Sequence, residues 1–223
     1  MKVVVTSATE KEIIQIKQTI NPAYTVNNPA FTVLFHQSGA GILSSCFSIL
    51  KLIFEEKPDL IIQAGIAGTF NNEIALSSIV SVKEEILADT GVEENGTFKD
   101  LFDLNLLNEN SLPFNNKRLI NTKLEKLNYL KLNEVTGITI NEITTRTERI
   151  AEYKTKYNPA VETMEGASLH YCCLQMSTSF IQIRAISNYI GERDKSKWEL
   201  KNTLKNLSET ILLYIDYLHE MNQ

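Results

Sequence analysis

Apolar and polar residues follow two kinds of pattern along the chain. Short apolar or alternating runs predict β-strands at residues 2–6, 31–36, 60–64, 78–84, 135–140, 160–162 and 180–186. Apolar positions spaced three or four residues apart predict helices at residues 10–20, 44–56, 147–157, 166–176 and 197–221. Strands that alternate with helices indicate a three-layer α/β/α sandwich around a central mixed, largely parallel sheet. Without a linker or repeat, we expect one domain over residues 1–223.

The spacing also assigns one face of two helices to the core. In the helix at 44–56 the predicted inward residues are Cys46, Leu50, Ile53 and Phe54. In the last helix the predicted buried face follows steps of three and four and consists of Leu200, Leu204, Leu207, Ile211, Ile215 and Leu218. Residues 87–112 are the least regular part, where Asn95-Gly96 predicts a tight turn.

Composition and charge narrow the class of protein. Of the 223 residues 43% are hydrophobic and 22% charged, which is ordinary for a soluble globular protein. The net charge of −5 argues against a broad surface for nucleic acid or an anionic membrane. No apolar run is long enough for a signal peptide or a membrane span. We therefore expect a cytoplasmic protein without a nucleic-acid or membrane partner.

Cysteine and histidine spacing argues against disulfides and metals. The cysteines are odd in number and lack CxxC spacing, which favours a reducing compartment, and adjacent Cys172 and Cys173 suit buried packing better than reactivity. No two histidines have the spacing of zinc ligands. Gly39-Ala40-Gly41 resembles a dinucleotide fingerprint, but Ser44 stands at the third glycine position, so a tight turn is favoured over a cofactor site. Gly65-Ile66-Ala67-Gly68 predicts a second turn, one that lines a ligand.

Two segments carry residues suited to chemistry. Val161-Glu162-Thr163-Met164-Glu165-Gly166-Ala167 places Glu165 on a short turn between strand and helix, although a carboxylate there also suits a helix N-terminus. Arg184-Ala185-Ile186-Ser187-Asn188 ends an apolar strand with an arginine inside it and an amide at its tip. Such an arginine either finds an anion or lies on a solvated edge strand, because burial without a partner is costly.

Together the two segments resemble the nucleoside phosphorylase superfamily, and most closely its hydrolytic members, the methylthioadenosine/S-adenosylhomocysteine nucleosidases and the futalosine hydrolases. Residues 6–12 resemble the acid-rich turn after the first strand of that family, and residues 136–141 resemble the strand before its base-binding loop. The resemblance covers nearly the whole chain. It implies a homodimer that acts on a small nucleoside and needs neither a metal nor an organic cofactor.

The resemblance also implies roles for individual residues. Met164 and Glu165 match the pair that binds the ribose hydroxyls, and Arg184 matches an arginine that orients the attacking water. The acid that activates this water maps best onto Glu12, with Glu10 as the other candidate. Further substrate-binding positions implied by the family are Ala67, Gly68 and, in the base-binding loop, Thr144.

Asn188 stands where the family members that cleave adenine nucleosides carry an aspartate. An amide donates to the 6-oxo group of hypoxanthine, whereas adenine presents a donor there, so Asn188 favours a hypoxanthine nucleoside such as futalosine. Asn188-Tyr189 and Lys197-Trp198 are also similar to the futalosine subgroup. To hold phosphate, the superfamily uses an arginine-bearing first loop and a serine in the glycine turn. Here the first loop carries two acids and the turn carries Ile66, so the resemblance implies water as the nucleophile.

Two alternatives remain open. One is an adenine-type nucleosidase, against which Asn188 argues. The other is a non-catalytic nucleoside-binding protein of the same fold, against which the retained acids and Arg184 argue. For the carboxylate tail of futalosine, Arg146 is a candidate ligand, and an exposed salt bridge is an equal explanation for it.

Overall fold

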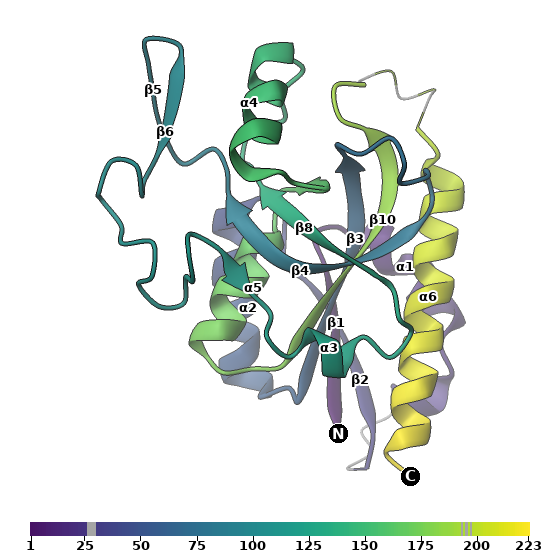
Figure 1. Ribbon diagram of the computed structural model, residues 1–223. Helices are drawn as coiled ribbons and strands as arrows, with labels where there is room; N and C mark the ends of the chain where they lie inside the picture. The colour runs from purple at the N-terminus through teal and green to yellow at the C-terminus, as the bar shows by residue number, and fades with distance from the viewer. Residues whose placement is uncertain (26–29, 193, 195, 197) are drawn as a thin grey trace.

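The computed structural model describes residues 1–25, 30–192, 194, 196 and 198–223, and strands alternate with helices along them (Figure 1). The strands are β1 (Lys2–Ser7), β2 (Thr32–Gln37), β3 (Leu60–Thr69), β4 (Ile79–Leu87), β5 (Gly91–Glu94), β6 (Thr97–Asp100), β7 (Leu119–Ile120), β8 (Asn133–Thr139), β9 (Val161–Thr163) and β10 (Phe180–Tyr189). The helices are α1 (Glu10–Thr19), α2 (Ile42–Glu56), α3 (Leu124–Leu127), α4 (Thr147–Tyr157), α5 (Gly166–Gln175) and α6 (Leu200–Met221), with a 3₁₀ turn at Pro22–Tyr24.

The main sheet is mixed and largely parallel, as the sequence predicts. Its strand order is β10-β4-β8-β9-β3-β1-β2, with β7 beside β4. The pairs β1–β2, β1–β3, β3–β10, β4–β8 and β8–β9 are parallel, whereas β4–β10, β3–β9 and β4–β7 are antiparallel. Because β10 pairs with both β4 and β3, the strands from β10 to β3 close into a ring.

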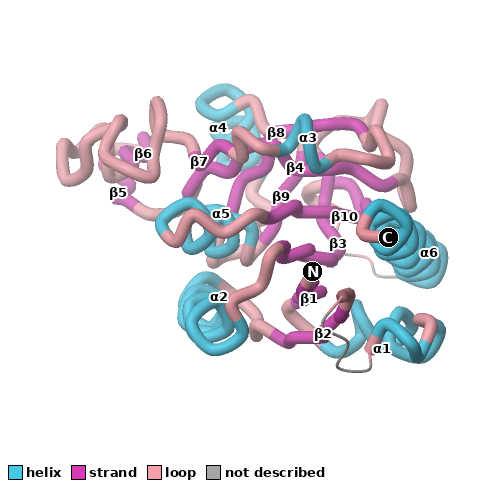
Figure 2. The backbone as a smooth tube through the Cα atoms, turned by 90° about the horizontal axis from the view of Figure 1, so that it is seen from below, coloured by secondary structure: helices cyan, strands magenta, loops and turns pink. Residues whose placement is uncertain are grey.

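Helices cover both faces of this sheet, which confirms the predicted α/β/α class (Figure 2). Alternation along β1 explains the two cores, because successive side chains of a strand point to opposite faces. Val3 and Val5 pack in the cluster that includes residues of α1 and α6, such as Ile13 and Ile211. Val4 packs in the cluster of α2 and α5. None of the described helices is long and apolar enough to cross a membrane.

Strands β3 and β10 run further than the sequence predicts. The apolar run of β3 stops at Ala64, yet its pairing with β10 continues to Thr69. Gly65-Ile66-Ala67-Gly68 is therefore part of a strand, and the predicted turn there is wrong. At Gly65 the absence of a side chain has a local cause, because a Cβ would overlap the guanidinium of Arg184. By contrast, Gly39 and Gly41 do form a turn, with φ of +81° and +83°.

The predicted buried faces of α2 and α6 are only partly correct. In α2 the buried residues are Ser45, Ile49, Leu52 and Ile53, whereas Phe54 is 65% exposed. Both sides of this helix are apolar, so periodicity does not select the side that packs on α5. In α6 the predicted residues from Leu207 onward are buried, but Leu200 and Leu204 are half-buried beside a cavity. Lys197, at the predicted start of this helix, lies outside the described residues.

Residues 87–112 are irregular, as expected, and the irregular stretch continues to residue 118. It contains the β5–β6 hairpin, whose turn is Asn95-Gly96, both with positive φ. The hairpin projects from the body of the molecule beside α4 (Figure 1).

Candidate active site

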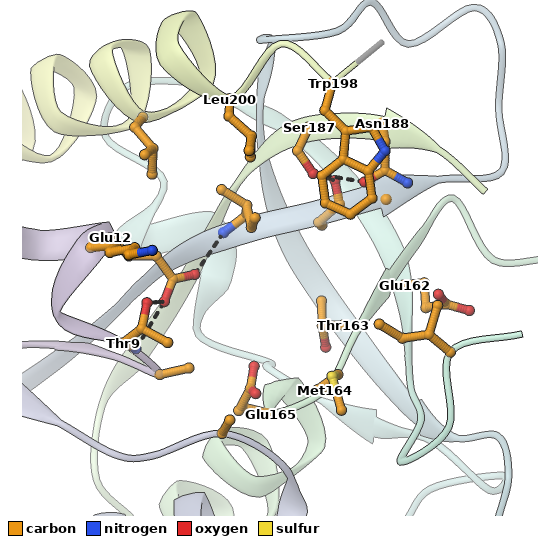
Figure 3. A pocket seen from close by; sticks show the side chains of 18 of the residues that line it. Thr9, Glu12, Glu162, Thr163, Met164, Glu165, Ser187, Asn188, Trp198 and Leu200 are labelled. Carbon is orange, nitrogen blue, oxygen red and sulfur yellow. Dashed lines mark hydrogen bonds between the residues drawn. The ribbon is translucent and has the colours of Figure 1, made fainter. Parts of the chain in front are cut away.

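A cavity of about 410 Å³ opens where β1, β3, β9 and β10 end. Ligand sites of α/β proteins commonly lie at this edge of the sheet. Figure 3 shows the cavity with Glu12, Glu165 and Asn188 on three of its sides. The residues that line it are Ala8, Thr9, Lys11, Glu12, Ala40, Ile66, Ala67, Gly68, Ile143, Glu162, Thr163, Met164, Glu165, Ser187, Asn188, Ile190, Trp198, Leu200 and Leu204.

Glu12 lies in the first turn of α1 and is held by three hydrogen-bond donors. Its Oε2 accepts from the Thr9 backbone N–H at 3.0 Å, as part of a capping box, and also from the Thr9 hydroxyl at 2.9 Å. Its Oε1 accepts from the N–H of Ile66 at 3.1 Å. Oε1 therefore keeps a free lone pair beside the cavity. Glu10, the alternative acid, is paired with Lys17 at 2.9 Å and does not line the cavity.

Glu165 lies between β9 and α5, and the residue is 6% exposed. Oε1 accepts a hydrogen bond of 2.9 Å from the N–H of Gly41, at the N-terminus of α2. Burial raises the pKa of Glu165, while the charge of Arg184 and the Gly41 N–H oppose that rise. The carboxylate thus accepts its hydrogen bond from the start of α2, although Glu165 itself precedes α5. The turn at Gly41, which has a positive φ, provides this N–H donor.

Asn188 lines the other end of the cavity from β10. Its Oδ1 accepts from the Ser187 hydroxyl at 2.8 Å, and its Nδ2 donates to the carbonyl of Tyr189 at 3.1 Å. The second N–H of Nδ2 is left for a ligand. In Figure 3 the indole of Trp198 lies next to Asn188 and Ser187, so this end of the cavity combines an aromatic ring with an amide.

Arg184 is buried beneath the cavity and does not line it. The side chain is 2% exposed, with Nη2 donating to Gln63 Oε1 at 2.7 Å and Nη1 to the carbonyl of Ile66 at 3.5 Å. Among the described residues no carboxylate lies within ion-pair distance of it. Its charge nevertheless acts on Glu165. The alternative of a solvated edge strand is wrong, because Arg184 is buried and β10 is paired on both sides. The role in orienting water, which the resemblance implies, stays a prediction.

Two residues singled out from the sequence lie away from the cavity. Thr144 is buried in the loop after β8, where its hydroxyl accepts from the N–H of Arg146 at 3.1 Å. Arg146 is exposed and faces Glu93 at 3.5 Å, beside a separate polar hollow that Thr144 also lines. From this loop it is Ile143 that reaches the cavity. The implied loop is therefore at the site, but through a different side chain.

Several lining residues were missed from the sequence. Lys11 brings a cation to the cavity, and Glu162 brings a third carboxylate. Leu200 and Leu204 were assigned to the core because the spacing of a helix does not distinguish a core from an apolar cavity wall. In the sheet Gly68 pairs with both Glu162 and Asn188, so these two lining residues flank the same glycine. This register cannot be read from the sequence. No group of three or more potential metal ligands occurs in the described parts of the chain.

Comparison with known proteins identifies the family of this chain. The sequence model of the phosphorylase superfamily matches residues 3–217. Futalosine hydrolase of Thermus thermophilus is 24% identical over 185 residues, which covers 80% of this chain and 79% of that protein. The 5'-methylthioadenosine/S-adenosylhomocysteine nucleosidase of Colwellia psychrerythraea is also 24% identical, over 95% of this chain and 94% of that protein.

A solved structure of a Colwellia psychrerythraea 5'-methylthioadenosine/S-adenosylhomocysteine nucleosidase, in complex with adenine, matches 97% of this chain and 95% of its own with a TM-score of 0.77 and 22% sequence identity. The α/β/α fold, together with relatives that are nucleosidases and hydrolases of small nucleosides, identifies the protein as an enzyme of that class. More particularly, the chain belongs to the phosphorylase superfamily.

Proposed function

We propose that the protein is a futalosine hydrolase, which cleaves the N-glycosidic bond of futalosine with water to give hypoxanthine and dehypoxanthine futalosine in menaquinone biosynthesis. The observation that carries the proposal is the placement of Glu12, Glu165 and Asn188 on three sides of one cavity. A carboxylate for the ribose, a carboxylate for water and an amide for the base are the groups that this hydrolysis needs. Futalosine hydrolases also stand among the relatives.

Glu165 and Met164 bind the ribose in this proposal. The bond to the base breaks with oxocarbenium character, so positive charge develops on the sugar. The carboxylate of Glu165 accepts from the ribose hydroxyls and offsets that charge, an interaction that strengthens in a buried site. Ala67 and Gly68 line the sugar from β3, where the small side chains allow close approach.

Glu12 activates the water. Its Oε1 has one lone pair free after the hydrogen bond from Ile66, so it can accept a proton while the capping box holds the side chain in place. Arg184 acts from below the cavity floor through its charge and through the Ile66 carbonyl, as a positioning residue. Three glutamates line the cavity against one lysine among the described residues, which disfavours a phosphate dianion and supports water as the nucleophile.

Asn188 selects the base. The free N–H of Nδ2 donates to the 6-oxo group of hypoxanthine, and Ser187 holds the amide oxygen in the opposite direction. Because an amide supplies no proton, solvent completes protonation of the departing base. For the tail of futalosine, Lys11 with Leu200 and Leu204 offers a cation beside apolar surface in the cavity itself, in place of Arg146.

The protein is further proposed to be a cytoplasmic homodimer. Large apolar side chains that monomers rarely expose occur together on α2, where Leu43, Phe47 and Phe54 are 87%, 72% and 65% exposed. A second copy of the chain would cover this face.

The alternative is a methylthioadenosine/S-adenosylhomocysteine nucleosidase, which the longer matched length of such relatives favours. The test is chromatography of the protein incubated with futalosine, inosine or 5'-methylthioadenosine, with and without phosphate. Release of hypoxanthine from futalosine at a phosphate-independent rate supports the proposal. Preferred release of adenine supports the alternative, a ribose 1-phosphate product refutes hydrolysis, and binding without turnover indicates a non-catalytic protein.

A further inference from the structure

A fully buried carboxyl group lies behind the candidate active site. Glu85 of β4 is 0% exposed and does not line the cavity. Its Oε2 accepts from the Thr139 hydroxyl at 2.9 Å, and its Oε1 accepts from Gln182 Nε2 at 2.8 Å and from the Thr163 hydroxyl at 3.4 Å. None of the catalytic steps proposed above uses this group.

Two glycines make room for the carboxyl group. A Cβ at Gly137 of β8 would lie 2.7 Å from Glu85 Oε1, and a Cβ at Gly166 would overlap the same oxygen. Gly166 is the first residue of α5 and follows Glu165 directly. Glu85 is therefore packed against the backbone that carries the ribose-binding glutamate.

The two threonine hydroxyls connect Glu85 to this helix start. Thr139 Oγ1 accepts from the N–H of Ala167 at 2.7 Å, and Thr163 Oγ1 accepts from the N–H of Gly166 at 3.1 Å. The first N–H groups of a helix have no partner within the helix, so these hydroxyls satisfy them. Each hydroxyl can do so while it donates its own proton to Glu85.

We propose that Glu85 is a positioning residue, which holds the N-terminal turn of α5, and through it Met164 and Glu165, by way of the hydroxyls of Thr139 and Thr163. The inference rests on the proposed hydrolysis for its kinetic consequence. Figure 3 shows Thr163, Met164 and Glu165 following one another along one wall of the cavity, so a shift at the start of α5 moves the ribose-binding side chains.

The protonation state of Glu85 links this support to pH. The titratable groups that face it are Arg184 of β10 and, beyond Gln182, His170 of α5. Burial raises the pKa of Glu85 to about 7, against the opposing effects of its hydrogen bonds and of Arg184. Burial lowers the pKa of His170 to about 4, so this imidazole is neutral near pH 7. Ionised Glu85 accepts from all three donors, whereas the protonated form loses an acceptor site.

The first test is the pH profile of Glu85→Gln, which mimics the protonated form at every pH. We expect kcat about tenfold below wild type at pH 8, the effect of one lost hydrogen bond to a charged group, with KM little changed. At pH 6 the two proteins should converge. Glu84→Gln is the matched control, because Glu84 accepts from Thr136 and pairs with Arg118 away from this site. A wild-type-to-variant ratio that is constant with pH overturns the proposal.

The second test addresses the hydroxyl of Thr139 and stays informative if Glu85→Gln does not fold. Thr139→Val should lower kcat, and Thr139→Ser, which restores the hydroxyl, should recover it. Thr136→Val is the control, since its hydroxyl serves Glu84. Equal losses in Thr139→Val and Thr139→Ser overturn the proposal.

The third test needs no substrate. Hydrogen exchange of the Gly166 and Ala167 amides should be faster in Glu85→Gln than in wild type or Glu84→Gln. Unchanged exchange at these amides overturns the proposal. If wild-type protein cleaves none of the nucleosides while exchange still responds to Glu85, the proposed function fails and the positioning role stands.

Discussion

Replacing Glu85 by glutamine should make the stability of the protein less dependent on pH. The pKa of this carboxyl group is raised from 4.5 to about 7 in the folded state by burial. The native state therefore binds a proton more tightly than the unfolded state, and unfolding releases it between these values. The stabilisation is fully present below about pH 4.5 and is lost as the pH rises through about 7, so the free energy of unfolding falls with pH.

The magnitude follows from the two pKa values. At 1.36 kcal/mol for each pH unit, the whole change is about 3 kcal/mol. Integration from pH 5.5 to pH 8.5 gives about 2 kcal/mol, because part of the change has already occurred below pH 5.5. Glutamine does not titrate and lacks this contribution. The fall in the free energy of unfolding should thus be about 2 kcal/mol larger for wild type than for Glu85→Gln.

Urea unfolding at pH 5.5 and pH 8.5 measures this difference, with fluorescence of the single tryptophan, Trp198, and far-UV circular dichroism as two probes. The Glu84→Gln variant retains Glu85 and should keep the wild-type fall. Contributions from other groups, including Glu165, cancel in the comparison. An equal fall in wild type and Glu85→Gln would refute the reasoning, because the buried carboxyl group would then not hold a proton near neutral pH.

Four further outcomes are expected. Glu165→Gln should lower turnover at least ~100-fold with little change in thermal stability, by kinetics and calorimetry, because the developing charge loses its counter-charge. Asn188→Asp should lower kcat/KM for hypoxanthine nucleosides by roughly 10- to 100-fold and lower kcat/KM for adenine nucleosides less. If the ratio of these two kcat/KM values is the same in wild type and variant, Asn188 does not recognise the base. Lys11→Gln should raise KM for futalosine up to about fivefold, because the tail of futalosine loses a cation, and should leave KM for inosine unchanged. Phe47→Lys should shift the mass measured by light scattering from that of a dimer to that of a monomer, because a charge then lies on the exposed apolar face of α2.

The fold could be predicted because its signals are local. The apolar run of β1 and the spacing of α1 identify their elements without reference to the rest of the chain. The extension of β3 through Gly65 could not be predicted, because it depends on pairing with β10 and on the space taken by Arg184. The buried side of α2 was missed for the opposite reason, since apolar residues on both of its sides leave the choice to tertiary contacts.

The candidate site divides in the same way. Glu12, Glu165 and Asn188 line the cavity, and they could be predicted because each belongs to a short segment with a recognisable order of residues. Thr144 was placed by its loop alone, and in that loop Ile143 faces the cavity instead. Glu85 gave no signal, because one of two adjacent acids in an alternating strand suits a solvated face as well as a buried one.

The two effects predicted for Glu85 act in opposite directions, so kinetics and unfolding test its role independently. Ionised Glu85 accepts from all three of its donors, yet its raised pKa predicts the greatest stability for the protonated form. A neutral side chain of similar shape would avoid the loss of stability at high pH. Residues that lower stability without a packing advantage concentrate at functional sites, where the lost stability is offset elsewhere. Gly137 and Gly166 leave the space that this carboxyl group occupies beneath the ribose-binding turn, so three positions of the chain together maintain one buried acid.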